Sequence, residues 1–361
     1  MKTEILKIIE GALEKDKSKV MKFAKQLALN ERKNGDEKFA KRIEECLNVQ
    51  GKGSIVLDDL LSLPVDNESR FEMLKLSSNK KTGNEFILSS TIKSKVADFL
   101  NFIKKQEEIQ KYNLSINQSL LLYGPPGCGK TSLAKQISDE LGLPLMTLRL
   151  DSTISSLLGS TSKNINRIFS FAKQNPCILF LDEFDAIAKA RNDSQELGEL
   201  KRVVNSLIQN IDDFSENGIL IAATNHQELL DRAIWRRFST QIYLGLPNAE
   251  ERIELLNLFL KKFPNDILGN QKKISRISEL TVDLSPAEIR NLCHNAIKRC
   301  VIRNKKSLDY SDFLYDLYVS SRLKNHDLES IVKFLHENFV PQENICQILN
   351  ISLRQVRKII L

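Results

Sequence analysis

Two periods of apolar and polar residues run through the middle of the chain. Short apolar runs bounded by turn residues predict buried strands at 119–123, 144–150, 177–183, 218–225 and 241–247. Between them, apolar residues recur every three or four positions, which predicts helices at 132–141, 164–174 and 199–211. This alternation predicts an α/β fold in which helices flank a parallel sheet.

The N-terminal part of the chain shows a helical period only. Apolar stripes over residues 3–48 predict two or three short helices, and the segment NVQGKGS at 48–54 is typical of a linker. Residues 55–90 look irregular, and a helix is expected from about 90 to 112.

Helical periodicity returns after the last predicted strand. Residues 249–320 predict a separate lid-like bundle, with Pro286 near the start of one helix, and the tail predicts three further helices. The predicted domains are a helical docking domain at 1–50, a linker at 51–90, an α/β core at 91–248, a helical lid at 249–320 and a trihelical domain at 321–361.

Composition and charge exclude few classes of protein. The 361 residues are 42% hydrophobic, which suffices for a large core, and the net charge of +7 is spread along the chain. The six cysteines form no CxxC pair, which fits reduced thiols in the cytoplasm. No signal peptide or apolar run of membrane-spanning length is found, so we expect a cytoplasmic protein without membrane contact.

A glycine-rich loop follows the first predicted strand and opens a helix. Its sequence GPPGCGKT has the spacing of a P-loop, whose backbone N–H groups surround phosphates. In this motif the lysine reaches the β and γ phosphates and the threonine hydroxyl ligates Mg²⁺. We therefore expect a nucleoside triphosphate to be bound by Gly124, Pro125, Pro126, Gly127, Cys128, Gly129, Lys130 and Thr131.

Cys128 stands inside this loop, at a helix N-terminus and near Lys130. That position favours a thiolate, so that alkylation or oxidation would block the nucleotide site. The alternative is that the cysteine is a small space-filling residue.

Polar residues end two of the other predicted strands. Asp182 and Glu183 follow five apolar residues, and ligands of open α/β sheets sit at that end of the strands. One carboxylate would hold Mg²⁺ and the other would polarise an attacking water. Asn225 ends the strand GILIAATN and could position that water against the γ phosphate.

Two adjacent arginines lie at the edge of the predicted core. Arg236 and Arg237 follow a short helix and precede the last strand. An arginine supplied by a neighbouring subunit accelerates phosphoryl transfer by about 10³ to 10⁵. The alternative is a solvated pair of side chains.

In this order the motifs resemble those of the AAA family of ring ATPases, and LDRAIWRRF resembles its meiotic-clade branch. The resemblance covers residues 85–310 or so. It implies ATP and Mg²⁺ as cofactors and a ring homo-oligomer, a hexamer in this family. By the resemblance, residues 124–131 form the Walker A motif. Asp182 would be the metal ligand of the Walker B motif, and Glu183 would be its water-activating residue. Asn225 would be sensor 1, and Arg236 with Arg237 would be the arginine fingers.

The family pattern also places a sensor 2 helix and a pore loop. The helix would span 284–296, where Pro286, Ala287 and Glu288 depart from the common Gly-Ala-Asp and leave the role of Arg290 open. The pore loop, which grips substrate, would contain Leu157, Leu158 and Gly159, with leucine in place of the usual aromatic residue. An ordinary apolar pair between helix and loop is the alternative.

The tail NICQILNISLRQVRKII has the spacing of a helix-turn-helix. Arg354, Arg357 and Lys358 could meet phosphates, but such trihelical units also serve as protein docks.

The resemblance implies an ATP-hydrolysing ring that remodels or unfolds protein substrates. No HExxH array occurs in the sequence, so we do not expect a zinc protease domain fused to the ATPase. A separately encoded partner, such as a protease, is part of the expectation. The alternative is a DNA-binding loader or remodeller that acts through the tail, and a third is an ATP-gated scaffold.

Overall fold

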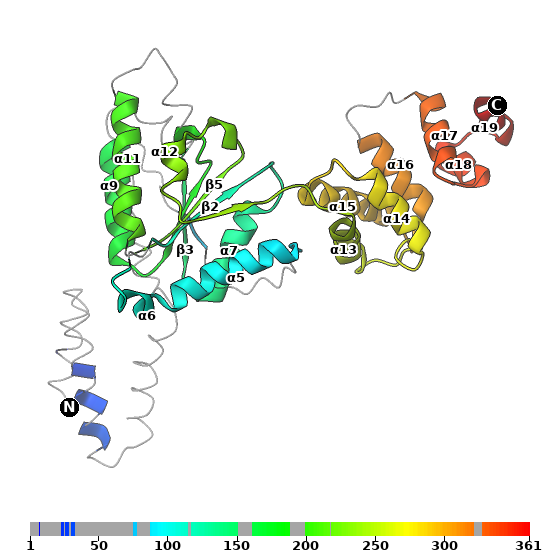
Figure 1. The fold of residues 1–361 in the computed structure, drawn as a ribbon. Coiled ribbons are helices and arrows are strands. Elements are labelled where there is room, and N and C mark those ends of the chain that lie inside the picture. Colours follow the sequence, from blue (N-terminus) through cyan, green and yellow to red (C-terminus); the bar gives the residue numbers. More distant parts are fainter. Residues whose placement is uncertain are drawn as a thin grey trace. The chain divides into compact units, whose positions relative to one another are not determined.

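The computed structural model describes residues 87–114, 117–150, 161–187, 199–216, 218–320 and 327–361, together with strand 75–77 and short stretches between residues 7 and 32 (Figure 1). It divides the chain into two compact units, one around residues 1–63 and the other around most of the remainder. In the first unit, the described parts of 23–32 are helical and Ala24, Leu27 and Ala28 are buried. This agrees with the predicted apolar stripe, whereas the extent of the docking domain stays a prediction.

The described strands form one six-stranded sheet in the order β1-β3-β4-β5-β2-β6. All pairings are parallel except that of β1 with β3. The strands are β1 Lys75–Ser77, β2 Ser119–Tyr123, β3 Leu145–Arg149, β4 Ile178–Asp182, β5 Ile219–Thr224 and β6 Thr240–Tyr243. The five predicted strands and their parallel arrangement are confirmed. The prediction of an irregular segment at 55–90 missed β1.

Helices cover the sheet as predicted. They are α5 Ser90–Lys104, α6 Gln106–Gln110, α7 Lys130–Leu141, α9 Thr161–Gln174, α11 Glu199–Ser215 and α12 Arg232–Trp235. The prediction of one continuous helix over 90–112 is wrong in one respect. The helix is interrupted at Lys105, whose backbone φ and ψ of −103° and 14° lie outside the helical region.

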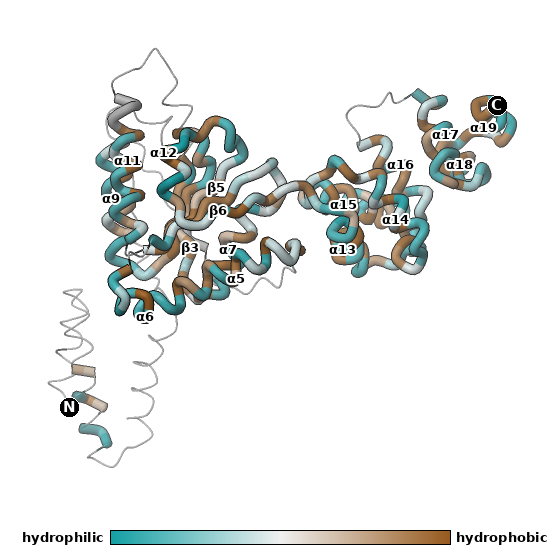
Figure 2. The backbone as a smooth tube through the Cα atoms, in the orientation of Figure 1, coloured by the Kyte–Doolittle hydropathy of each residue, from teal (hydrophilic) through white to brown (hydrophobic). Residues whose placement is uncertain are grey.

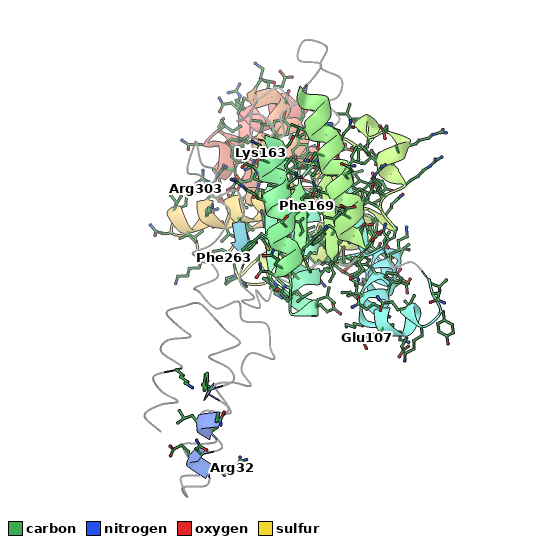
Figure 3. The ribbon with its side chains drawn as sticks, turned by 90° about the vertical axis from the view of Figure 1, so that its left-hand side faces the viewer. Arg32, Glu107, Lys163, Phe169, Phe263 and Arg303 are labelled. Atoms are coloured by element: carbon green, nitrogen blue, oxygen red, sulfur yellow. The ribbon has the colours of Figure 1, made fainter. Side chains whose placement is uncertain are left out.

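Burial explains why the central strands could be recognised from the sequence. All of β5 is buried, as are all but the last residues of β2 and β4. Both faces of a parallel sheet are covered by helices, so its strands are apolar throughout. In Figure 2 these strands form an apolar centre beneath more polar helices. On one face of the sheet, Phe169 of α9, labelled in Figure 3, packs edge-on against another ring. That ring is Phe214 of α11, and the two ring centroids are 5.8 Å apart.

The region after β6 is helical, as predicted. Its helices are α13 Ala249–Leu260, α14 Gln271–Leu280, α15 Pro286–Ile302 and α16 Tyr310–Ser320. Asn248 and Ser285 each form a capping box at the start of a helix, and Pro286 takes the first position of α15, where its missing N–H costs nothing.

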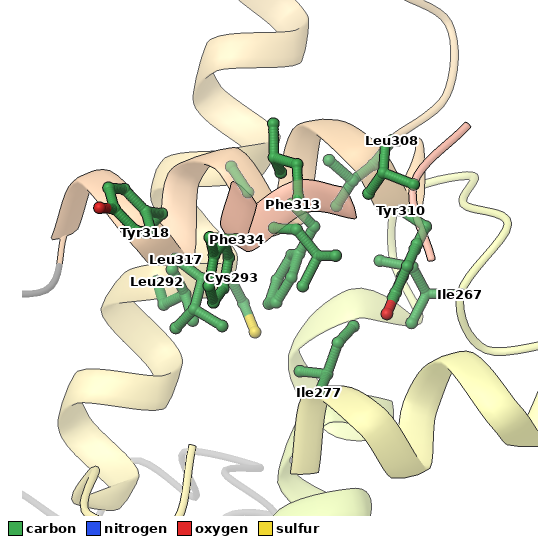
Figure 4. Close-up of a cluster of buried hydrophobic side chains, with 14 of the residues drawn as sticks. Ile267, Ile277, Leu292, Cys293, Leu308, Tyr310, Phe313, Leu317, Tyr318 and Phe334 are labelled. Atoms are coloured by element: carbon green, nitrogen blue, oxygen red, sulfur yellow. The ribbon is translucent and has the colours of Figure 1, made fainter. Parts of the chain in front are cut away.

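The three predicted tail helices are α17 Leu328–Glu337, α18 Gln342–Leu349 and α19 Leu353–Ile360. They share one apolar core with the lid helices (Figure 4). Within it, Phe334 of α17 packs against Tyr318 of α16 with centroids 4.9 Å apart, and the Tyr310 hydroxyl donates to the Asn338 carbonyl at 3.2 Å. The packing thus ties the tail to the lid, and the boundary at 320 stays a prediction.

A buried carboxylate in the lid makes its stability depend on pH. Asp316 of α16 is ion-paired with Arg299 of α15, yet burial raises its pKa to about 6. A carboxyl that binds its proton more tightly when folded stabilises the fold at low pH, and this contribution is lost as pH rises through 6.

We therefore expect the free energy of unfolding of the wild type, relative to that of Asp316→Asn, to be larger by about 1 kcal/mol near pH 5 than near pH 7.5. Urea unfolding of both proteins at the two pH values measures this difference. An equal pH dependence in the variant, which cannot titrate at this position, would show that Asp316 is not the group responsible.

Within the part of the chain that the structure describes, no helix is long and apolar enough to cross a lipid bilayer.

Candidate active site

The predicted phosphate loop joins β2 to α7 and has glycine where only glycine fits. Gly124 has φ of 138°, and a Cβ there would lie 2.2 Å from the Leu244 carbonyl oxygen. Gly127 has φ of 77°, and its Cβ would lie 2.6 Å from Ser285 Oγ. Both φ values are in the region that L-residues avoid. The strand, loop and helix that the motif requires are therefore all present.

Lys130 is the first residue of α7 and is only 8% exposed. Its ammonium donates to the carbonyls of Gly124 and Pro125 at 2.7 and 2.8 Å, so it folds back over the loop. Burial lowers its pKa, partly opposed by Asp182 and Asp185. A buried cation held by neutral carbonyls favours an incoming anion, which is what a phosphate-binding lysine requires.

The prediction of a reactive Cys128 thiolate is wrong. The side chain is buried, and this burial raises the pKa of the thiol, an effect larger than the opposite one of Lys130. Its Sγ contacts the Pro126 carbonyl oxygen at 3.9 Å. The space-filling interpretation is the one that the structure supports.

Alkylation should therefore spare Cys128 in the folded protein. We expect a maleimide near pH 7.5 to modify the partly exposed Cys346 well before Cys128 and to leave ATPase activity unchanged meanwhile, because the thiolate is the reacting species. Peptide mass spectrometry over time measures the order, with urea-unfolded protein as the control in which both react. Early labelling of Cys128 with loss of activity would contradict this.

The first carboxylate of β4 lies beside the loop threonine. Asp182 Oδ2 accepts from the Thr131 hydroxyl at 3.4 Å, at the carboxyl end of the sheet, where β5 lies between β4 and the β2 strand that leads into the loop. The described residues contain no cluster of three or more His, Cys, Asp and Glu that could hold a metal. A hydroxyl and one carboxylate nevertheless fit Mg²⁺, which takes one or two protein oxygens and completes its shell with phosphates and water.

The second carboxylate stands on strained backbone. Glu183 has φ of 56°, a left-handed conformation that is uncommon outside glycine and costs of order 1–3 kcal/mol. Two hydrogen bonds hold it: its own N–H donates to Asp182 Oδ1 at 3.0 Å, and the N–H of Phe184 donates to the Ala223 carbonyl at 2.8 Å. Such strain is typical of functional positions.

A cation on the neighbouring strand pairs with Glu183. Arg149, the last residue of β3, lies opposite Asp182 in register, and its Nη2 is 3.3 Å from Glu183 Oε1. Both side chains are more than a third exposed, so water screens this pair. Arg149 could not be recognised from the sequence, because no local motif marks it.

The end of β5 is fixed by a buried carboxylate. Asp185 is 5% exposed, and its Oδ1 accepts from the Thr224 hydroxyl at 3.2 Å. The same hydroxyl oxygen accepts from the N–H of His226 at 3.1 Å. Asn225 lies between these two anchored residues, at the same edge of the sheet as Asp182 and Glu183.

The two arginines after α12 have different surroundings. Arg237 donates from Nη1 to the Ala233 carbonyl at 2.6 Å and pairs with Asp212 of α11 at 3.0 Å. The Arg236 side chain is exposed, and among the described residues its guanidinium has no ion pair or hydrogen bond. The guanidinium of Arg237 is therefore held by contacts within the protomer, whereas that of Arg236 is exposed to solvent.

This turn is attached to β2 at both ends of the strand, through its backbone at one end and through the Trp235 side chain at the other. At the start, the Ser119 hydroxyl donates to the Arg237 carbonyl at 2.8 Å and accepts from the N–H of Ser239 at 3.0 Å. At the end, Tyr123 packs edge-on against Trp235 with centroids 4.9 Å apart. Tyr123 directly precedes the phosphate loop and Trp235 directly precedes Arg236, so β2 links the two. The sequence offered one sign of this attachment, because the single tryptophan of the chain directly precedes the arginine pair.

The start of α15 lies against the phosphate loop, where the sensor 2 helix is expected. The N–H of Ala287 donates to the Gly127 carbonyl at 3.2 Å, and Glu288 caps the helix through Ser285. Arg290, one turn further on, is exposed, and its role stays open. The predicted pore residues Leu157, Leu158 and Gly159 lie outside the described residues.

Comparison with known proteins gives the class of this fold and site. Residues 120–246 match the profile of the ATPase family associated with various cellular activities (AAA). An AAA family ATPase of Sinorhizobium fredii named y4kL is 42% identical over 231 residues, which cover 64% of this chain and 68% of that protein.

Other relatives are longer. The ATP-dependent zinc metalloprotease FtsH of Cupriavidus metallidurans is 32% identical over 253 residues, covering 68% of this chain and 38% of the relative. The ATP-dependent zinc metalloprotease YME1 homologue of Schistosoma mansoni is 35% identical over 218 residues, which cover 59% of this chain and 32% of the relative. The chain thus spans about two thirds of the first relative, and 38% and 32% of the two metalloproteases.

The fold agrees with solved structures. The crystal structure of the FIGL-1 AAA domain in complex with ADP superimposes with a TM-score of 0.57 at 21% identity, over 76% of this chain and 94% of that one. A second crystal structure of the FIGL-1 AAA domain superimposes with a TM-score of 0.58 at 23% identity, over 78% of this chain and 94% of that one.

The chain belongs to the AAA family of ATPases, and it is an enzyme that hydrolyses ATP. The resemblance drawn from the motifs and the expected α/β fold with its helical C-terminal region are confirmed.

Proposed function

We propose that this ATPase works as a homo-oligomeric ring, in which each site is completed by the neighbouring protomer. The observation that carries the proposal is the exposed Arg236 guanidinium, which has no partner among the described residues although its backbone is anchored on both sides. An exposed, positioned cation is what a neighbour's γ phosphate requires in the transition state. A hexamer is the ring size expected from the family.

Within one protomer the phosphate loop holds ATP. The Lys130 ammonium and the N–H groups of the loop residues other than Pro125 and Pro126 bind the phosphates, and Thr131 with Asp182 would hold Mg²⁺. When bound, Mg²⁺ neutralises charge that develops on the β and γ phosphates.

Hydrolysis needs a polarised water near the γ phosphate. Glu183 accepts the proton of that water, and the Asn225 amide orients it. The pair with Arg149 competes for the Glu183 carboxylate, so Glu183 must exchange this partner for water before it acts as a base.

We propose that ATP hydrolysis drives the remodelling or unfolding of a protein substrate. Two relatives are named ATP-dependent metalloproteases, whose substrates are proteins, and this supports a remodelling or unfolding activity. Leu157 stays the proposed substrate-gripping residue, and a partner such as a separately encoded protease stays part of the proposal.

The experiment is to measure ATP hydrolysis with a permanently unfolded protein, with the same protein folded, and with duplex DNA. Stimulation by the unfolded chain alone is the expected result. Stimulation by duplex DNA alone would instead favour the nucleic-acid remodeller, and a rate insensitive to every addition would favour the ATP-gated scaffold.

A further inference from the structure

The tail contains two short helices joined by a tight turn. Helix α18 ends at Leu349, Asn350 adopts the left-handed conformation with φ of 53° and ψ of 47°, and Ser352 caps α19. The turn is fixed further by the N–H of Ile351, which donates to the Cys346 carbonyl at 3.2 Å, and by the Ser352 and Gln355 capping box. This is the local geometry of a helix-turn-helix, in which the second helix enters the major groove of DNA.

Helix α17 completes a trihelical unit around the turn. Val332 and Leu335 of α17, Ile345 of α18 and Val356 of α19 are buried in the shared core. Val356 is the one buried residue of α19 in the described structure, so most of this helix faces outward on a packed base. A recognition helix requires this combination, because it must be rigid yet exposed.

The exposed surface of α19 is basic. Arg354, Arg357 and Lys358 are all exposed, and α19 contains no acidic residue. Within the described tail, the acidic residues belong to α17 and its cap or to α18, and Glu329 already pairs with Lys333 at 2.7 Å. Arg357 Nε also lies 3.4 Å from Gln342 Oε1, which orients it between the two helices.

From this geometry and charge we infer that α18 and α19 bind double-stranded DNA, with α19 in the major groove. Arg354 near the start of α19 can reach base edges, while Arg357 and Lys358 contact phosphates on the groove wall. The inference goes beyond the proposed remodelling activity and does not depend on it. A protein partner would instead call for an apolar contact area, and on α19 only Leu353 and Leu361 beside it are exposed apolar residues.

The test is fluorescence anisotropy of a labelled random-sequence DNA duplex titrated with the full chain at about 50 to 200 mM salt. The variant is Arg354→Ala/Arg357→Ala/Lys358→Ala, and Lys333→Ala on α17 is the control for loss of a cation from the same unit. We expect the triple variant to bind at least about tenfold more weakly and the slope of log K against log salt to fall by about 2 to 3. Lys333→Ala should bind as the wild type does, and the ATPase rate without DNA should stay unchanged in every variant.

Absence of duplex binding by the wild type, or equal binding and salt slope in the triple variant, would overturn the inference. Tight binding of an unfolded protein that the same three substitutions abolish, without duplex binding, would also overturn it and make this face a protein dock. Arg354→Ala and Lys358→Ala are measured singly as well, so that a folding defect of the triple variant cannot conceal the result. The ATPase rate with unfolded protein is read separately, and its failure would concern only the proposed remodelling.

Discussion

Replacing Glu183 by glutamine is expected to lower the kcat for ATP hydrolysis by about 10² to 10⁴ while ATP binding persists. Glutamine keeps the size of the side chain but cannot take a proton from water. The phosphate loop and Lys130 are untouched, so the nucleotide still binds. Single-turnover hydrolysis and the binding of a fluorescent ATP analogue separate the two quantities.

The matched control is Glu140→Gln at the far end of α7, where the same chemical change meets an exposed side chain. It should leave both quantities at wild-type values. Loss of nucleotide binding in Glu183→Gln would contradict the assignment of ATP binding to the phosphate loop and Lys130, and a wild-type kcat would remove Glu183 from the reaction.

Replacing Arg236 by alanine is expected to lower kcat by about 10³ to 10⁵, which is on the order of 4 to 7 kcal/mol in the barrier. The guanidinium is exposed, so its removal leaves the fold intact, and it lies outside the protomer's own phosphate loop, so ATP binding should be preserved. Steady-state hydrolysis, together with nucleotide affinity and the oligomeric state by light scattering, measures the effect.

Arg232→Ala is the control, because Arg232 is an exposed arginine on α12, the short helix that ends just before Arg236. It should retain most of the activity. Arg237→Ala should act differently from both, because it breaks the ion pair with Asp212 and loosens the turn. An Arg236→Ala protein as active as Arg232→Ala would contradict the proposed role.

Much of the fold could be predicted because fully buried parallel strands are apolar throughout. The strands at 119–123 and 177–183 show this, and the glycines of the phosphate loop marked the turn between strand and helix. Strand β1 could not be found in this way, because KLS is a short edge strand whose pairing with β3 is a long-range contact. The break at Lys105 left the helical period unchanged.

From the sequence, a site residue could be proposed only where its residue type and its place in the order of motifs both point to one role, and these assignments stay predictions. Sequence could not distinguish Arg236 from Arg237, because two adjacent arginines have the same chemistry and only the position of Asp212 separates them. Nor could it find Arg149, whose contact with Glu183 depends on strand register, or the burial that keeps Cys128 a thiol.

The central claim is that one protomer's ATP is hydrolysed with the arginine of its neighbour. Lys130→Ala cannot bind ATP but still offers Arg236, whereas Arg236→Ala binds ATP but offers no arginine, so each is expected to be inactive alone. The measurement is the ATPase rate of the two variants mixed in equal amounts at the total concentration used for each. We predict that the mixture hydrolyses ATP, because some interfaces then contain one intact loop and one intact arginine; a mixture as inactive as its components would contradict the claim.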